Sequence, residues 1–165
     1  MESFRPGHWG CFKSFRSCIL ESLECDDDFV IICERDCHLL YDRDYMMKRI
    51  NEACDLMASQ DIDIFSLGDT KDLDYGYTQS EVVGEIGESS FITDKIIGLQ
   101  FQIFSRKGIE FLSKCFDDIP WNGMDIWLNH VYGQNRERKR AIFKNRLTTQ
   151  FNGVSTIDGN YKKFL

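Results

Sequence analysis

Two carboxylates, Glu34 and Asp36, directly follow the apolar run Phe29–Cys33, which has the composition of a buried strand. In an open parallel sheet, ligands bind just beyond the carboxyl ends of the strands. Two acidic side chains one residue apart at such a position can both face one divalent cation, and a cation of the Mg²⁺ type joins carboxylates to substrate phosphates. The pair therefore indicates a metal and diphosphate site, with a charged strand-to-loop junction as the alternative.

A third carboxylate, Asp125, stands at the start of a predicted helix whose apolar stripe consists of Met124, Trp127, Leu128 and Val131. Because this stripe faces the core, Asp125 is left to point into a cleft, where it could act as a general base toward a sugar hydroxyl. The alternative is an acid in the first helical turn that the helix dipole stabilises. The sequence leaves both interpretations open.

Positive charge is concentrated in the segment 134–146 of a chain whose net charge is −7. The segment holds six basic residues and the single acid Glu137, a net +5, so the rest of the chain carries −12. A basic segment on an acidic protein suits a phosphate-bearing ligand or an anionic partner. A solvated helix face is the alternative.

Seven cysteines are present, an odd number, and no export signal precedes them. This pattern is typical of reduced thiols in a cytosol-like compartment, where residues in apolar runs such as Cys18 and Cys54 act as small hydrophobes. Cys33, Cys37 and His38 are close enough in sequence to suggest zinc, but no second ligand pair of recognisable spacing accompanies them. We therefore expect core cysteines and a cytoplasmic protein.

The elements that must position these residues alternate between helix and strand. Apolar residues at three- and four-residue steps predict helices, and short continuous apolar runs predict buried strands. Such alternation is typical of an α/β domain with a largely parallel sheet. The predicted helices span 9–24, 42–58, 106–116 and 124–131, and the predicted strands span 29–33, 62–67 and 96–104. The segment 68–95 is predicted to be a polar loop with at most a short strand around Val82–Val83, and the tail from 148 is predicted to be irregular.

Length and composition limit the classes that remain. A chain of 165 residues, 42% of them hydrophobic, suits one domain with a core of its own. The net negative charge argues against a protein that coats nucleic acid, and no apolar run reaches the roughly 18–20 residues of a membrane span. No Gly-x-Ser-x-Gly, phosphate-loop or Gly-x-Gly-x-x-Gly motif occurs, which excludes the usual serine-hydrolase and dinucleotide-binding readings.

Taken together, the motifs resemble the glycosyltransferase family of lipooligosaccharide-biosynthesis and collagen galactosyltransferases, which is similar in fold to other nucleotide-sugar transferases of the GT-A type. The resemblance covers nearly the whole chain in the family's order. The matching positions are Gly7, Gly10, Cys11 and Ser14 (with Phe15 in place of a His), Glu34-Arg35-Asp36 at the family's Glu-Asp-Asp, Ser105 to Gly108, Pro120, Asp125 to Leu128, and Ser155 to Ile157.

The resemblance implies a fold and an activity. It implies a single glycosyltransferase-like domain over 1–165, with a GT-A-like (Rossmann-like) mixed sheet flanked by helices and lacking the first N-terminal strands. Within it, 68–95 is a long polar loop and 134–165 a basic segment with an irregular tail. The implied reaction moves a hexose from a nucleotide diphosphate sugar to a hydroxyl with inversion, using Mn²⁺ or Mg²⁺ held by Glu34 and Asp36 and Asp125 as the catalytic base.

The resemblance also suggests partners. UDP-hexose is the expected donor, and a glycan, a lipid-linked sugar or a protein hydroxyl is the expected acceptor. The residues expected to bind donor or acceptor are Ser14, Arg35, Arg106, Trp121, Arg138 and Arg140.

Two alternatives accompany this hypothesis. A non-catalytic glycosyltransferase-like protein would keep the sheet for binding or assembly but would have lost nucleoside binding. Alternatively, a second chain, or a second copy in a homo-oligomer, would supply the strands that the resemblance finds missing, which predicts an exposed sheet edge when the chain is alone.

Overall fold

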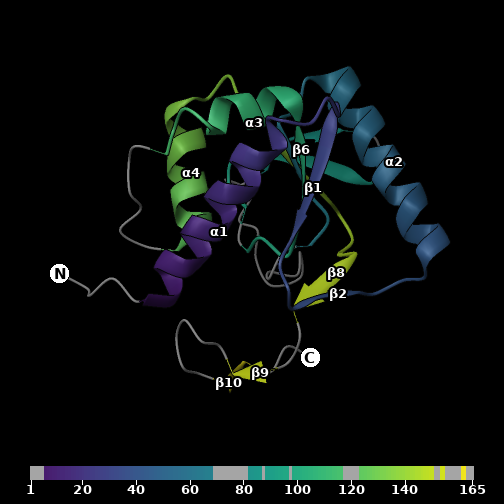
Figure 1. Ribbon diagram of the computed structural model, residues 1–165. Coiled ribbons are helices and arrows are strands. Elements are labelled where there is room, and N and C mark those ends of the chain that lie inside the picture. The colour runs from purple at the N-terminus through teal and green to yellow at the C-terminus, as the bar shows by residue number, and fades with distance from the viewer. Residues whose placement is uncertain are drawn as a thin grey trace.

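The computed structural model describes residues 6–68, 82–86, 88–96, 98–116, 123–150, 153–154 and 161–162, which form a mixed α/β structure with an open six-stranded sheet (Figure 1). The elements are, in chain order, α1 (Pro6–Ser22), β1 (Phe29–Cys33), β2 (Cys37–Leu39), α2 (Arg43–Gln60), β3 (Ile64–Ser66), β4 (Val82–Ile86), β5 (Ser90–Thr93), β6 (Phe101–Ser105), α3 (Arg106–Leu112), α4 (Met124–Gln134), β7 (Arg140–Phe143), β8 (Thr148–Gln150), β9 (Gly153–Val154) and β10 (Tyr161–Lys162).

The main sheet has the strand order β1-β6-β3-β7-β5-β4, and two short pairs, β2 with β8 and β9 with β10, stand apart from it. Only β3 and β7 run parallel among these described strands, so the prediction of a largely parallel sheet is wrong. β1, β3 and β7 nevertheless point the same way. We call the side of the sheet at which these three strands end the carboxyl edge, and the side at which they begin the amino edge. These two terms refer to strand ends and not to the outermost strands, β1 and β4.

The reversal at β6 has a physical cause in the segment that precedes it. β5 runs antiparallel to β7 and therefore ends at the amino edge. The chain then crosses one face of the sheet beside α4 and reaches the carboxyl edge, where the carbonyl of Gln100 accepts a hydrogen bond from the backbone N–H of Glu34 at 2.9 Å. β6 starts from there and must run back, which makes it antiparallel to both of its neighbours.

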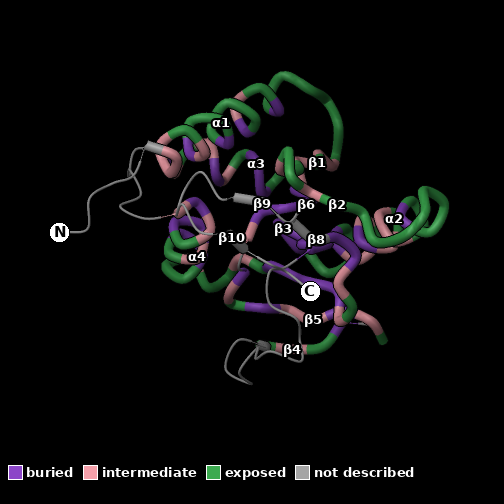
Figure 2. Tube along the Cα trace, turned by 90° about the horizontal axis from the view of Figure 1, so that it is seen from below, coloured by how far each residue is buried: buried purple, intermediate pink, exposed green. Residues whose placement is uncertain are grey.

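Helices cover both faces of the sheet. One hydrophobic cluster joins α1, α3 and α4 to side chains such as Ile64 and Phe104, and a second joins α2 to Phe65 and Ile103. Successive strand residues point to opposite faces, so these neighbouring residues serve different clusters. The two layers stand on either side of the sheet in Figure 1, and the central strands β3 and β6 between them are largely buried in Figure 2.

Most of the predicted elements are present with small changes at their ends. The strand 29–33 is found as predicted, and the helix predicted over 42–58 is α2. The side chain of Asp42 caps α2 by accepting a hydrogen bond from the backbone N–H of Tyr45 at 2.9 Å. Asp61 ends the helix in the left-handed conformation, with a φ of 56°.

The two segments without a strong predicted pattern contain more strand than expected. In the described part of 68–95, the short strand allowed around Val82–Val83 is β4, which forms a hairpin with the unpredicted strand β5, and β5 pairs with β7. The basic segment contributes β7 to the middle of the sheet, and the start of the tail predicted to be irregular forms β8, which pairs with β2. No described helix is long and apolar enough to cross a membrane.

Candidate functional site

Glu34 and Asp36 lie in a tight turn at the carboxyl edge, directly after β1. The turn closes with a hydrogen bond of 3.1 Å from the backbone N–H of Cys37 to the carbonyl of Glu34. Glu34 is partly buried, whereas Arg35 and Asp36 are exposed. The chain therefore presents the two acids at the end of a strand, where the sequence predicted them.

Asp125 lies in the first turn of α4, two residues after the N-cap Gly123. Glycine has no side chain, so it cannot donate or accept a capping hydrogen bond there. Its two carboxylate oxygens accept hydrogen bonds from different backbone groups: Oδ1 from the N–H of Ile126 at 2.9 Å and Oδ2 from the N–H of Gly98 at 3.3 Å. Gly98 precedes β6, so Asp125 fastens the amino end of α4 to the segment that reaches the carboxyl edge.

Cys11 of α1 shows that the three acids share one region. The pKa of its thiol is raised to about 11, first by burial and then by the negative charges of Glu34, Asp125 and Asp36. The backbone gives a geometric link between them: Asp125 accepts a hydrogen bond from Gly98, and the carbonyl of Gln100, two residues later, accepts one from the N–H of Glu34. The two predicted metal ligands and the predicted base, about ninety positions apart in the chain, therefore lie in the same part of the molecule.

Two glutamines next to these acids were not singled out by the sequence analysis. Gln100 and Gln102 lie on the α1/α4 face, are each 1% exposed, and have side-chain oxygens with no hydrogen-bond partner. The amide of Gln102 donates to the hydroxyl of Ser66 at 2.9 Å and to the carbonyl of Gly98 at 3.3 Å. The signal was visible: two polar residues alternate within the otherwise apolar stretch 96–104.

Of the other residues predicted to bind donor or acceptor, the three arginines Arg106, Arg138 and Arg140 have partners within the protein, away from the acids. Ser14 is exposed on α1, and Trp121 lies outside the described residues. Arg106 starts α3 at the amino edge, where its guanidinium donates to the carbonyls of Ser22 and Asp27 at 3.0 Å each, and to that of Cys25. We therefore assign Arg106 to the turn that follows α1, and not to ligand binding.

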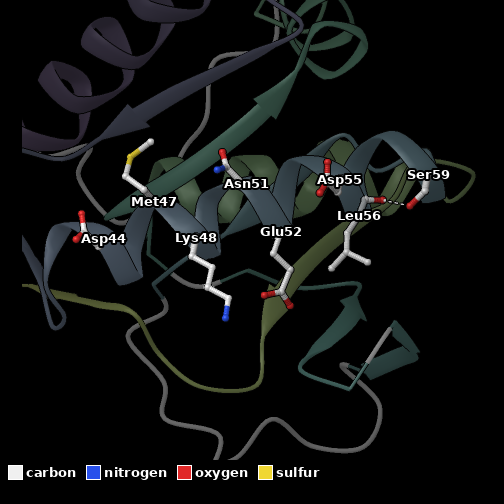
Figure 3. Close-up of a pocket in the computed structure, with 8 residues that line it drawn as sticks. All are labelled: Asp44, Met47, Lys48, Asn51, Glu52, Asp55, Leu56 and Ser59. Atoms are coloured by element: carbon white, nitrogen blue, oxygen red, sulfur yellow. Dashed lines mark hydrogen bonds between the residues drawn. The ribbon is translucent and has the colours of Figure 1, made fainter.

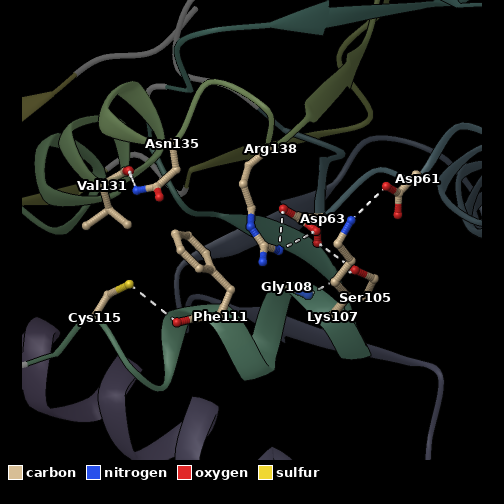
Figure 4. A network of polar contacts seen from close by, with 10 residues as sticks. All are labelled: Asp61, Asp63, Ser105, Lys107, Gly108, Phe111, Cys115, Val131, Asn135 and Arg138. Atoms are coloured by element: carbon tan, nitrogen blue, oxygen red, sulfur yellow. Dashed lines mark hydrogen bonds and ion pairs between the residues drawn. The ribbon is translucent and has the colours of Figure 1, made fainter.

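Arg138 also lies at the amino edge, where it pairs with the buried carboxylate of Asp63 (Figure 4). Its Nη1 atom is 3.2 Å from Oδ1 and 3.1 Å from Oδ2 of Asp63, and its guanidinium stacks over Phe111 at 4.1 Å. Burial raises the pKa of Asp63, and Arg138 opposes that rise. The partner of Arg138 is thus already within the protein, at the edge away from Glu34 and Asp36.

Arg140 begins β7 and is 2% exposed. It donates to Oδ1 of Asn129 at 2.6 Å and to the carbonyl of Asp94, and it stacks over Tyr132. Asn129 in turn accepts from the backbone N–H of Ile96 at 2.9 Å and donates to its carbonyl at 2.7 Å. Arg140 therefore holds the segment before β6 against α4, and a solvated helix face, the alternative considered for this basic segment, does not describe it.

Cysteines contribute no disulfide to this region. All seven are free, and Cys18, Cys25 and Cys33 are exposed, so the expectation of core cysteines is wrong for these three. Among the residues that the structure describes, no group of three or more His, Cys, Asp or Glu side chains is placed to hold a metal ion. Any metal at Glu34 and Asp36 would need further oxygen ligands from its substrate.

A separate groove follows the outer side of α2, on the other face of the sheet from Asp125 (Figure 3). Among the described residues, those that line it all belong to this helix: Asp44, Met47, Lys48, Asn51, Glu52, Asp55, Leu56 and Ser59. Of these, Glu52 is engaged by Arg49 and by the hydroxyl of Ser89. None of the residues with predicted chemistry lines the groove.

Comparison with known proteins adds no assignment. No protein-family model matches the chain, and no curated protein matches its sequence.

Proposed function

We propose that the chain is a glycosyltransferase that moves a hexose from a nucleotide diphosphate sugar, UDP-hexose in the first instance, to a hydroxyl of an acceptor. The observation that carries the proposal is the position of the three acids at the carboxyl edge: Glu34 and Asp36 lie in the turn after β1, and Asp125 is bonded to Gly98, two residues before the Gln100 carbonyl that binds the N–H of Glu34. Two carboxylates at a strand end and a third on a facing helix match the needs of a diphosphate-bound cation and a nearby base. The order of motifs along the chain supports the same reaction.

The donor set at the carboxyl edge fits Mn²⁺ or Mg²⁺ in kind, because both ions prefer oxygen ligands. Glu34 and Asp36 would hold the ion, and the donor's phosphate oxygens would complete its coordination. When bound, such an ion supplies positive charge that offsets the charge developing on the diphosphate leaving group.

Asp125 is the proposed general base. Hydrogen bonds from two backbone N–H groups, at 2.9 Å and 3.3 Å, orient its carboxylate and leave further lone pairs on both oxygens. In the proposed step, Asp125 takes the proton of the acceptor hydroxyl while that oxygen bonds to the anomeric carbon. The bond from this carbon to the diphosphate oxygen breaks on the opposite side, and the configuration inverts.

The test is donor hydrolysis and transfer with UDP-glucose and UDP-galactose, with and without Mn²⁺. Wild type is compared with Asp36→Asn and with Asp61→Asn, a matched change of an exposed acid at the amino edge. We expect Mn²⁺-dependent turnover that Asp36→Asn abolishes and Asp61→Asn leaves intact. Equal turnover in wild type and Asp36→Asn would overturn the metal role.

A non-catalytic binding or assembly protein is the second candidate. Two observations favour it: the described residues contain no three-ligand metal group, and Phe15, at the family's His position, is a buried core residue packed against Phe104. Calorimetry with UDP and UDP-glucose at millimolar concentration, with Mn²⁺ present, separates the candidates. Absence of any binding would favour the non-catalytic protein.

The outer edge of β1 supports an additional proposal about partners. β1 ends the strand order of the described sheet, and Ile31 at its centre is 45% exposed. Backbone groups on such an edge can pair with a strand from a second copy or another chain. Sedimentation at several concentrations tests the homo-oligomer: a monomer at all of them would exclude pairing between copies.

A further inference from the structure

Gln100 and Gln102 are two of the buried polar groups in the described residues that the proposed mechanism has not used, and they lie next to Asp125 and Glu34. Each is 1% exposed, and each has an Oε1 atom without a hydrogen-bond partner. Leaving one buried acceptor unsatisfied costs roughly 1–3 kcal/mol, and most buried polar groups in proteins avoid that cost. Two such oxygens near the end of one strand therefore require an explanation.

The orientation of the Gln102 amide follows from its neighbours. The hydroxyl of Ser66 donates its proton to the carbonyl of Gly68 at 2.7 Å, so toward Gln102 it can only accept. The carbonyl of Gly98 is likewise an acceptor, 3.3 Å from Nε2. Both contacts require the NH₂ side of the amide. The Oε1 atom therefore points away from them, and a hydrogen-bond donor is what it lacks.

Gly98 brings the remaining polar groups together. Its φ of 82° lies in the left-handed region, and a Cβ at this position would stand 2.7 Å from both amide atoms of Gln100. The backbone conformation therefore favours glycine, and the amide of Gln100 fills the space that a Cβ would take. The N–H of Gly98 binds Asp125, and its carbonyl binds Gln102. Gln100, Gln102 and Asp125 consequently meet at one residue.

We propose that the unpaired Oε1 atoms of Gln100 and Gln102 accept hydrogen bonds from hydroxyl groups of the hexose. This inference rests on the proposed function and deepens it, because it names the residues that recognise the sugar. A site whose buried groups need a substrate hydroxyl discriminates strongly against an analogue that lacks it, because these groups are then left unpaired. Both glutamines are covered in the structure, so the sugar must displace what covers them before it binds.

The first experiment compares UDP with UDP-glucose and UDP-galactose by calorimetry in the presence of Mn²⁺, using the full chain. The variant is Gln100→Met, which keeps the length of the side chain and removes the acceptor. We expect unchanged binding of UDP and about tenfold or greater weakening for the UDP-hexose that wild type prefers. The matched control is Ser90→Ala, which removes the unpartnered buried hydroxyl of β5 and should leave both affinities unchanged.

A second measurement uses wild-type protein alone and so does not depend on the folding of a variant. UDP-sugars that each lack one hydroxyl should include at least one that binds about tenfold or more weakly than the parent. Equal affinities for all of them, or undiminished UDP-hexose binding by Gln100→Met, would overturn this inference while the proposed function stands. If wild type binds neither UDP nor UDP-hexose, the proposed function fails, and this inference fails with it.

Discussion

The amino and carboxyl edges of the sheet both carry acidic side chains, but they differ in whether the aspartates there pair with basic side chains of the described residues. At the amino edge, Asp63 pairs with Arg138 and Asp61 with Lys107. At the carboxyl edge, no described lysine or arginine forms an ion pair with Asp36 or Asp125, and two buried glutamine oxygens lack a donor. The amino edge pairs its charges within the protein, which stabilises the fold, whereas the carboxyl edge has unpaired acceptors and negative charge that the proposed ligand would use.

The largest expected effect belongs to the carboxyl edge and concerns activity. Replacing Asp125 by Asn removes the proposed base, so the transfer rate should fall about 10²- to 10⁴-fold. The free energy of unfolding should fall by no more than about 1 kcal/mol, the usual value of an acid in the first turn of a helix. Transfer assays and urea denaturation measure the two quantities. An Asp125→Asn protein with full transfer activity would contradict the proposal that the carboxyl edge serves catalysis and the amino edge serves stability.

The next effect belongs to the amino edge and concerns stability. Arg138→Met leaves the carboxylate of Asp63, which is 1% exposed, without its cation. Breaking a buried pair in this way costs about 3–5 kcal/mol of unfolding free energy. The matched control is Lys107→Met, which removes an exposed pair and should cost about 1 kcal/mol or less. Similar losses in the two variants would contradict the structural role of Arg138.

The same variant makes a prediction about pH. Burial already raises the pKa of Asp63 in the folded protein, and loss of Arg138 should raise it further. The folded state then binds a proton that the unfolded chain releases, so the unfolding free energy of Arg138→Met should increase as the pH falls from the raised pKa toward the ordinary Asp value of about 3.9. Denaturation at several pH values measures this slope. A steady decrease over that range would show the opposite sign.

Gly108 provides a smaller test of the amino edge. A Cβ at this position would stand 2.6 Å from the backbone oxygen of Asp63, and a backbone atom cannot easily move aside. Gly108→Ala should therefore destabilise the protein by about 1–3 kcal/mol. Gly133 of α4 has nothing within 4 Å of such a Cβ, so Gly133→Ala should instead stabilise the protein by up to about 1 kcal/mol. Thermal denaturation of both variants decides the comparison.

The smallest effect concerns the reactivity of the Cys11 thiol, whose pKa is raised in part by the acids of the carboxyl edge. The pKa of Cys11 is about 11, with burial as the larger cause and the nearby carboxylates as the lesser one. Asp125→Asn should therefore lower this pKa and speed alkylation of Cys11 at pH 8, by about tenfold or less. Mass spectrometry of the alkylated peptides gives the rate, with the exposed Cys18 of the same helix as control. An unchanged rate at Cys11 would show that Asp125 lies too far away to act on it.

The sequence predicted the elements around the carboxyl edge because each has a strong local pattern. Phe29–Cys33 is a continuous apolar run that ends at charged residues, and α2 combines an amphipathic period with Asp42 as its cap. The position of Glu34 and Asp36 follows from the end of that strand, and the position of Asp125 follows from the apolar stripe of α4. Their meeting around one thiol depends on how α1, α4 and β1 pack together, which no local pattern contains.

The direction and neighbours of the strands could not be predicted in the same way. β7 has only four residues and begins with Arg140, so its sequence resembles a basic surface segment, although it occupies the middle of the sheet. Arg140 is tolerated there because Asn129 and the carbonyl of Asp94 accept its hydrogen bonds. Arg106 and Arg138 were likewise assigned to ligands because charge alone does not reveal a carbonyl or carboxylate that lies far away in the sequence.

Where a nucleotide sugar binds tests the difference between the two edges most directly. The measurement is a crystal structure of the chain grown with Mn²⁺ and UDP-glucose or UDP-galactose. We predict the cation and diphosphate beyond the ends of β1, β3 and β7, next to Glu34 and Asp36, with the hexose toward Asp125 and Gln100. Density in the α2 groove or at the amino edge, or no density at saturating concentration, would contradict the account.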